Sequence, residues 1–327
     1  MGALSGIKNG LRRAIATRPA VNRAGRPLAR LLTAANVERR KHYPIVGTFP
    51  VRLPWGDKLT LLTRREDWLL TALYWYGFDE GESAELTVFR TLARQSKTIL
   101  DIGANIGVFG LAVAADNPQA QVHAFEPLPD NSAILKDLIA INGLKNLTAH
   151  DVALSDQAGE AKFYVPRNRL CNVRDGSLVA GFRDDVDEVP VKLVTLDQFA
   201  ADKGLTKIDL MKIDVESAEV LVLSGARGVL RRDRPAMICE VLSGGEGGPL
   251  EKLMSDFDYR YFWVGPGGLY ENEHLEGDPQ EKYRMQLMLP EEKALDLLWT
   301  LEKVGFKAMP RGARGVATTE APRAAVA

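Results

Sequence analysis

Five apolar, strand-like runs of this chain each end in a carboxylate, and these carboxylates could do chemistry. The runs are TILD, VHAFE, NLTAHD, IDLMKID and AMICE, and they end at Asp101, Glu126, Asp151, Asp214 and Glu240. A carboxylate can attract a cationic ligand, accept hydrogen bonds from hydroxyl groups or remove a proton. A row of such residues therefore indicates a cofactor site.

The spacing of the acids predicts the elements that position them. Successive acids lie 25, 25, 63 and 26 residues apart. A strand with its helix and two loops takes about 25 to 30 residues, so three intervals are single β-α units and the 63-residue interval contains an insertion. Ligands of an open parallel sheet bind outside the carboxyl ends of its strands. We therefore expect an α/β protein whose mostly parallel, doubly wound sheet presents the acids at one edge.

The composition is that of an ordinary globular protein. Hydrophobic residues make up 46% and charged residues 26% of the 327 residues. No apolar run approaches the ~18 residues of a membrane-spanning helix, and no stretch has the pattern of a signal peptide. Cys171 and Cys239 lack metal-ligand spacing, which argues against a disulfide framework or a zinc site. A cytoplasmic enzyme without a nucleic-acid partner is the default expectation.

The net charge of −1 conceals a basic N-terminal arm over residues 1–45. This arm holds ten lysines and arginines against the single Glu38. Its first part has apolar residues at helical spacing (Leu4, Ile7, Leu11 and Ile15). Such an arm could make a peripheral contact with an anionic membrane or dock a partner, and it could also be a solvated arm packed on the body. The short stripe without aromatic anchors favours the solvated arm.

The remaining sequence divides into an extension, a core and a tail. Residues 46–96 are expected to form an N-terminal extension, a β-hairpin and then a helix over 82–95. Residues 97–309 are expected to form the main domain, with a β insertion over 154–198. Residues 310–327 lack apolar periodicity, and we expect them to be disordered.

Two elements are expected after the last acid. The run DYRYFWV (258–264) is typical of an edge strand, and residues 291–304 have leucines at helical spacing. Both belong to the main domain.

The sequence of the turn after the first strand, DIGANIG (101–107), indicates which cofactor the site would bind. A dinucleotide-binding G-x-G-x-x-G would need glycine where this chain has Asn105 and Val108. Asp101 ahead of the glycines also opposes a phosphate, because like charges repel. S-adenosylmethionine fits better, since it carries a sulfonium and an ammonium and no phosphate.

Two further acids agree with that cofactor. Glu126 could accept both ribose hydroxyls, although nicotinamide enzymes also place an acid there. Asp151 could accept the adenine amino group. The same residues could be helix caps or turn formers, but their combination with the acid-first turn favours the cofactor.

These residues resemble the FkbM-type S-adenosylmethionine-dependent methyltransferases. The matching segments are GFDEGE (77–82), DIGANIG (101–107), VHAFEPLPDN (122–131), NLTAHDVALSD (146–156), VTLDQF (194–199), IDLMKIDVESAE (208–219) and PAMICEV (235–241). The resemblance implies a class I Rossmann-like methyltransferase that methylates a hydroxyl of a sugar, glycan or secondary metabolite.

The resemblance also implies a set of cofactor contacts. These are Glu80, Asp101 and Gly103 at the methionine end, Asn105 and Gly107 in the turn, Glu126 at the ribose, and Asp151 with Val152 at the adenine. There are two departures from the family pattern. Asp79 replaces a tyrosine and Ser217 replaces a glycine, which leaves the capping of the cofactor and the backbone after KIDVE open.

Methyl transfer to a hydroxyl requires alignment and the removal of a proton. Asp214 is the first choice as base because it ends the strand beside the expected transfer site, with Glu216 and Glu240 in reserve. The three carboxylates could instead hold Mg²⁺. Glu216 could equally be a first-turn helix acid that the macrodipole favours.

The acceptor is expected to be a small molecule or glycan. Ser177 and Arg174 are weak candidates for its side of the site, and Arg167 and Arg169 could help bind an anionic acceptor or form a solvated loop. The oligomeric state stays open.

Two other functions remain. One is a nicotinamide-dependent oxidoreductase on the same sheet, against which Asn105 and Val108 argue. The other is a non-catalytic, membrane-associated scaffold that uses residues 1–45.

Overall fold

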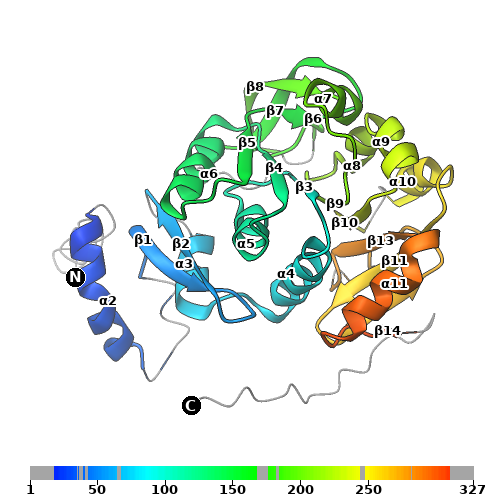
Figure 1. The fold of residues 1–327 in the computed structure, drawn as a ribbon. Helices are drawn as coiled ribbons and strands as arrows, with labels where there is room; N and C mark the ends of the chain where they lie inside the picture. Colours follow the sequence, from blue (N-terminus) through cyan, green and yellow to red (C-terminus); the bar gives the residue numbers. More distant parts are fainter. Residues whose placement is uncertain are drawn as a thin grey trace.

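The protein is an α/β structure built around one large sheet (Figure 1). The computed structural model describes residues 18–34, 36, 40, 43–64, 68–167, 176–181, 184–243, 247–280 and 282–309. The helices are α2 (Pro19–Leu32), α3 (Trp68–Tyr76), α4 (Glu80–Ala93), α5 (Val108–Asp116), α6 (Pro129–Ile141), α7 (Leu196–Asp202), α8 (Glu219–Ser224), α9 (Arg227–Asp233), α10 (Gly247–Met254) and α11 (Glu291–Glu302). The strands are β1 (Gly47–Arg52), β2 (Lys58–Thr63), β3 (Thr98–Ile102), β4 (Gln121–Phe125), β5 (Leu147–His150), β6 (Ala153–Leu154), β7 (Gly159–Pro166), β8 (Val186–Val194), β9 (Leu210–Ile213), β10 (Ala236–Glu240), β11 (Tyr259–Gly265), β12 (Gly268–Asn272), β13 (Met285–Pro290) and β14 (Ala308–Met309).

The large sheet has the strand order β14-β12-β11-β13-β10-β9-β3-β4-β5. Within this sheet, β5, β4, β3, β9 and β10 are parallel to one another, and β13 runs antiparallel to β10. The chain runs outward from β3 to β5 and then returns to β9 on the other side of β3. This reversal is a topological switch point, the place where such sheets bind ligands. The predicted class I Rossmann-like fold is confirmed.

The central strands are buried on both faces, and this makes the sheet doubly wound. Alternate residues of one strand belong to different cores, because side chains along a strand point to opposite faces. Ile99 packs in a core with Phe89 of α4 and Leu111 of α5. Its neighbour Leu100 packs in a second core with Leu230 of α9.

The predicted N-terminal extension is a hairpin followed by helices. β1 and β2 pair antiparallel, and the side chain of Asn142, the C-cap residue of α6, bonds both the backbone N–H and C=O of Thr60. The start of α4 is fixed by a capping box: the Asp79 carboxylate accepts from the backbone N–H of Glu82, and the Glu82 carboxylate accepts from the backbone N–H of Asp79. Asp79, the departure from the family tyrosine, is therefore a helix cap.

The predicted insertion is a separate three-stranded sheet of β6, β8 and β7. Arg167, directly after the end of β7, forms ion pairs with Asp185 and Asp187. Arg169 and Arg174 lie outside the described residues.

The expectation of an edge strand over 258–264 is wrong. β11 pairs with β12 on one side and β13 on the other, so it lies inside the sheet. β12 (GLYEN) and the two-residue β14 extend the sheet beyond it, and neither has enough alternating apolar residues to be recognised in the sequence. α11 agrees with the helix expected over 291–304. The proposed boundaries of the arm, domain and tail stay predictions, and residues 1–17 and 310–327 lie outside the described part.

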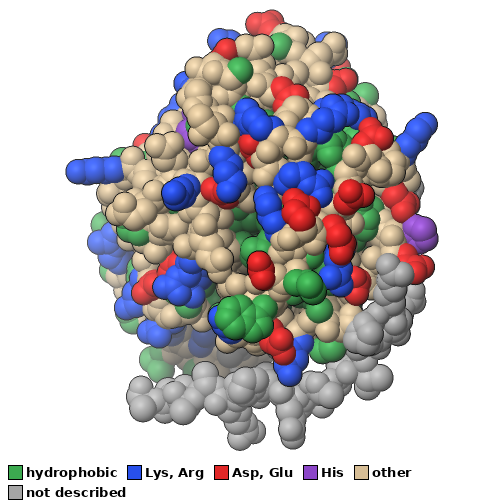
Figure 2. All heavy atoms as spheres, turned by 45° about the vertical axis from the view of Figure 1, so that its right-hand side comes forward, with side chains coloured by type: hydrophobic (Ala, Val, Ile, Leu, Met, Phe, Trp, Pro, Cys, Tyr) green, Lys and Arg blue, Asp and Glu red, His purple; other side chains and the backbone are tan. Residues whose placement is uncertain are grey.

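Within that part, no helix combines the length and apolar character needed to cross a bilayer. On the face drawn in Figure 2, acidic and basic side chains are interspersed.

Candidate active site

A cavity of about 870 Å³ lies at the carboxyl ends of β3, β4, β9 and β10. Most of the predicted site residues line it: Asp101, Gly103, Asn105, Glu126, Val152, Asp214, Glu216 and Glu240. Gly107, Asp151 and Ser177 are not among its described lining residues. Arg174 lies outside the described residues, and Glu80 is described only as the backbone that begins α4.

The turn after β3 needs its glycine because two loops meet there. Gly103 has φ +74°, and a Cβ on it would lie 1.8 Å from the backbone oxygen of Asp214. Asn105 is also left-handed, with φ +55°, and its backbone N–H donates to Glu126 at 2.9 Å. This turn therefore joins the end of β3 to the ends of β4 and β9.

Glu126 is buried at the end of β4, with 5% of its surface exposed. Its two carboxylate oxygens accept hydrogen bonds from the backbone N–H groups of Leu128 and Asn105, each at 2.9 Å. Burial raises the pKa of Glu126 to about 7, although these bonds and one from Asn131 lower it. The carboxylate is held rigidly at the cavity wall.

Asp101 is fully buried and faces a lysine that sequence reasoning missed. One of its carboxylate oxygens accepts from the backbone N–H of Gly110 at 2.8 Å, and the other lies 3.9 Å from Lys212 Nζ. Lys212 Nζ donates to Asp214 at 2.9 Å. Burial raises the pKa of Asp101; burial would lower the pKa of Lys212, but Asp214 and Asp101 raise it above its ordinary value. The buried lysine thus links the ends of β3 and β9.

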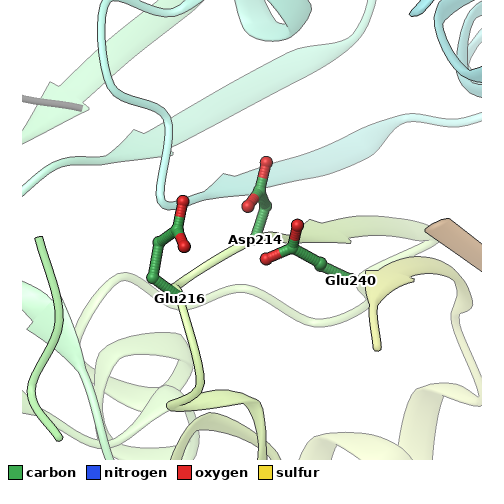
Figure 3. A group of neighbouring side chains, drawn as sticks. All are labelled: Asp214, Glu216 and Glu240. Carbon is green, nitrogen blue, oxygen red and sulfur yellow. The ribbon is translucent and has the colours of Figure 1, made fainter. Parts of the chain in front are cut away.

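Asp214, Glu216 and Glu240 turn their carboxylates toward one another (Figure 3). Each offers a ligand oxygen within 4.8 Å of the others. Glu240 is buried, and one of its oxygens lies 2.9 Å from Arg284, while the other has no hydrogen-bond partner in the part of the chain that the structure describes. Burial and the charges of Asp214 and Glu216 raise the pKa of Glu240 to about 9. The cluster can hold a proton or a cation.

The backbone after Asp214 has two consecutive left-handed residues, Glu216 with φ +52° and Ser217 with φ +77°. The family glycine suits such a φ, and Ser217 adopts it nonetheless. The hydroxyl of the buried Ser177 donates to the Glu216 carbonyl at 2.5 Å, so the insertion holds this strained turn. Ser177 therefore has a structural contact rather than a contact with the cavity.

Asp151 and Val152 point in different directions, as successive residues of an extended segment do. Asp151 binds the hydroxyl of Ser132 and lies 2.5 Å from Lys136 Nζ, both on α6. Val152 lines the cavity. A role for Asp151 at the adenine stays a prediction, and the geometry favours Val152.

A second residue missed by sequence reasoning is Glu85 of α4, which also lines the cavity. Burial and the charge of Asp214 raise its pKa to about 8. Glu85 sits in a helix that begins with several acids, so its type and position carry no signal that separates it from a solvated helix face.

Comparisons with known proteins agree with these motifs. Residues 101–261 match the model of the methyltransferase FkbM domain. The 31-O-demethyl-FK506 methyltransferase FkbM of Streptomyces tacrolimicus is 30% identical over 167 residues, which cover 40% of this chain and 60% of that protein. The 2-O-methyltransferase NoeI of Sinorhizobium fredii is 28% identical over 155 residues, which cover 44% and 63%. The chain thus spans about 60% of the length of these two relatives.

Among solved structures, a methyltransferase FkbM from Methylobacillus flagellatus superposes with a TM-score of 0.39 and 13% identity, over 68% of this chain and 53% of that one. The similarity to the family rests on the sequence match and the motifs it contains. Residues 101–261 of this chain match the methyltransferase FkbM domain.

Proposed function

We propose that the protein is an S-adenosylmethionine-dependent O-methyltransferase that acts on a hydroxyl group of a glycan or secondary metabolite. The observation that carries the proposal is the buried Glu126 carboxylate, held at the cavity wall by two backbone N–H groups. An acid at the end of the second strand is suited to accept the hydroxyls of a ribose.

The charge of the cavity supports a cationic cofactor. Its acidic lining residues are Asp79, Glu82, Glu85, Asp101, Glu126, Asp214, Glu216 and Glu240, and its basic ones are Lys212, Lys282 and Arg284. Glu85 and Glu240, with pKa values of about 8 and 9, hold protons at neutral pH, and the remaining six acids still outnumber the three basic residues. A cavity with an excess of acids attracts a sulfonium and an ammonium, and it repels the pyrophosphate of a nicotinamide dinucleotide.

On this proposal the turn at Gly103 lets the cofactor approach the backbone closely, Glu126 binds the ribose and Val152 packs on the adenine. Asp101 supports the methionine end together with the start of α4. When bound, the cofactor supplies a methyl group already activated by its sulfonium.

The residues at the end of β9 and β10 handle the acceptor proton. Asp214, oriented by Lys212, is the proposed base that accepts the proton of the acceptor hydroxyl. Glu240, whose pKa is raised to about 9, holds a proton at neutral pH and suits hydrogen-bond donation to the acceptor. Glu216 is the remaining candidate.

A Mg²⁺ ion is a second way to use the same residues. The oxygens of Asp214, Glu216 and Glu240 lie within 4.8 Å of one another, and the unpartnered oxygen of Glu240 is buried. Hard carboxylate ligands fit Mg²⁺, which would polarise the acceptor hydroxyl.

The names of two relatives support a hydroxyl group as the acceptor. One is named for a demethylated FK506 and another is named a 2-O-methyltransferase. Both names describe methylation at oxygen, and the carboxylates of Asp214, Glu216 and Glu240 offer a base for a hydroxyl proton.

The direct test is titration calorimetry with S-adenosylhomocysteine, with and without Mg²⁺. We expect wild type to bind and Glu126→Ala to lose about 100-fold in affinity, because charge-assisted hydrogen bonds to the ribose are lost. The matched control is Glu160→Ala on β7, an exposed glutamate outside the cavity, which should bind like wild type.

Circular dichroism of Glu126→Ala and of the more conservative Glu126→Gln shows whether the fold is intact. Failure of wild type to bind contradicts the proposal. Binding of NAD(P) instead would restore the oxidoreductase alternative.

A further inference from the structure

An ordinary surface helix buries its apolar face. Helix α2 instead buries polar side chains and exposes apolar ones. Asn22 and Arg26 are buried against the body, with 3% and 8% of their surfaces exposed. Four apolar side chains of the same helix are instead exposed by 46 to 73%: Val21, Leu28, Leu31 and Leu32, here called the α2 ridge. The helix lies at one margin of the protein beside β1 (Figure 1).

Specific hydrogen bonds hold α2 in this orientation. The Asn22 side-chain amide donates to the Pro44 carbonyl at 2.6 Å and accepts from the backbone N–H of Val46 at 3.2 Å. Arg26 donates to the Val46 carbonyl at 3.0 Å and to Asn22 at 3.2 Å. Because Asn22 and Arg26 bind the segment before β1, the α2 ridge faces away from the rest of the protein.

A basic groove of about 550 Å³ lies between α2, β1 and Tyr74 of α3. Its lining includes Arg23, Arg26, Arg30 and Tyr74 and contains no acid. None of the three arginines forms an ion pair with a described residue; Arg26 and Arg30 stack over the Tyr74 ring at 4.9 and 5.6 Å. The guanidinium groups of Arg23 and Arg30 are exposed, and without an ion-pair partner among the described residues they are suited to phosphate.

We propose that α2 binds the surface of an anionic phospholipid membrane. The ridge enters the boundary between headgroups and acyl chains, and the arginine groove takes lipid phosphates. Charge complementarity supports this occupant, since residues 1–37 contain no acid at all. A second copy of the chain is disfavoured, because pairing two α2 ridges would bring arginines of like charge together.

The test is co-sedimentation of the full-length protein with vesicles of phosphatidylcholine alone or mixed with phosphatidylglycerol. We expect binding only to the mixed vesicles, weakened by salt. Leu28→Ser/Leu32→Ser should weaken it roughly tenfold or more through lost apolar burial. Arg23→Gln/Arg30→Gln should weaken it about fivefold for each arginine, the effect of one basic residue at an anionic surface.

Two matched controls remove equivalent groups elsewhere. Leu295→Ser removes the exposed leucine of α11, and Lys192→Gln/Lys252→Gln removes two exposed positive charges from β8 and α10. Both should bind like wild type. No binding by wild type, or unchanged binding by the leucine double variant, overturns the proposal. A dimer in solution that the leucine double variant dissociates would overturn it as well, in favour of self-association.

Discussion

The two ends of the cavity hold their carboxylates in opposite ways. At the proposed cofactor end, both carboxylate oxygens of Glu126 accept from backbone N–H groups that the fold fixes. At the proposed transfer end, Asp214, Glu216 and Glu240 face one another, and a buried oxygen of Glu240 has no hydrogen-bond partner among the described residues. Glu126 is therefore held in place by the backbone, whereas the three carboxylates of the proposed transfer end can take up a proton, a cation or an acceptor.

The largest effect is expected from a substitution at the contact between the two ends, where Gly103 packs against the backbone of Asp214. Gly103→Ala places a Cβ 1.8 Å from the Asp214 carbonyl oxygen and strains a φ of +74°. We expect a loss of about 4 kcal/mol or more in the free energy of unfolding and no detectable binding of S-adenosylhomocysteine. Urea denaturation and calorimetry measure the two effects.

The control for Gly103→Ala is Gly143→Ala. Gly143 has a similar φ of +65°, but no atom lies within 4 Å of its added Cβ. This variant should lose only about 1 kcal/mol, the cost of a left-handed alanine. Equal losses in both variants would show that the contact between the two loops does not matter.

The sequence predicts which strand-end acids meet at the cavity better than it predicts which way the residues after a strand point. The intervals between acids reveal the strands, and the edge of a parallel sheet then brings Asp101, Glu126 and Asp214 together. The residue order does not reveal the direction of a side chain after its strand has ended. Asp151 turns to Lys136 on α6, so its neighbour Val152 takes the place in the cavity.

Lys212 and Glu85 were missed for a related reason. Lys212 is the single polar residue inside the strand run LMKI, where alternation allows a surface position as well as a buried one. Its burial follows from two acids that compensate its charge, Asp214 two residues further along the same run and Asp101 on the neighbouring strand β3. Such compensation between distant segments is visible only in three dimensions.

The pH dependence of stability distinguishes the two ends. Below about pH 4.5 the raised carboxyls are protonated in both folded and unfolded chains. As the pH rises, the unfolded chain releases these protons first, so the free energy of unfolding falls until the folded pKa is reached. That point is about 7 for Glu126 and about 9 for Glu240. Between pH 7 and 9, the titration of Glu240 should therefore lower the free energy of unfolding by about 3 kcal/mol.

Urea denaturation from pH 5 to 9 checks these windows in single variants. Glu240→Gln should flatten the curve above pH 7, and Glu126→Gln should flatten it below pH 7. Mg²⁺, if it binds the cluster, should reduce the slope above pH 7 in wild type, to which Glu85 with its pKa of about 8 still contributes, and should have no such effect in Glu240→Gln. If the curve of Glu240→Gln runs parallel to that of wild type, the pKa of Glu240 is not raised in the folded protein.

The smallest expected effect concerns the strained turn at the transfer end. Ser217→Gly should raise the free energy of unfolding by about 1 kcal/mol, because glycine adopts the observed φ of +77° without steric cost. The matched control, Ser224→Gly at the last residue of α8, should lower it by about 0.5 to 1 kcal/mol, since glycine in a helix loses more entropy on folding. Opposite signs in the two variants would show that Ser217 stores strain beside the cluster, and a loss in both would show that its side chain stabilises the turn.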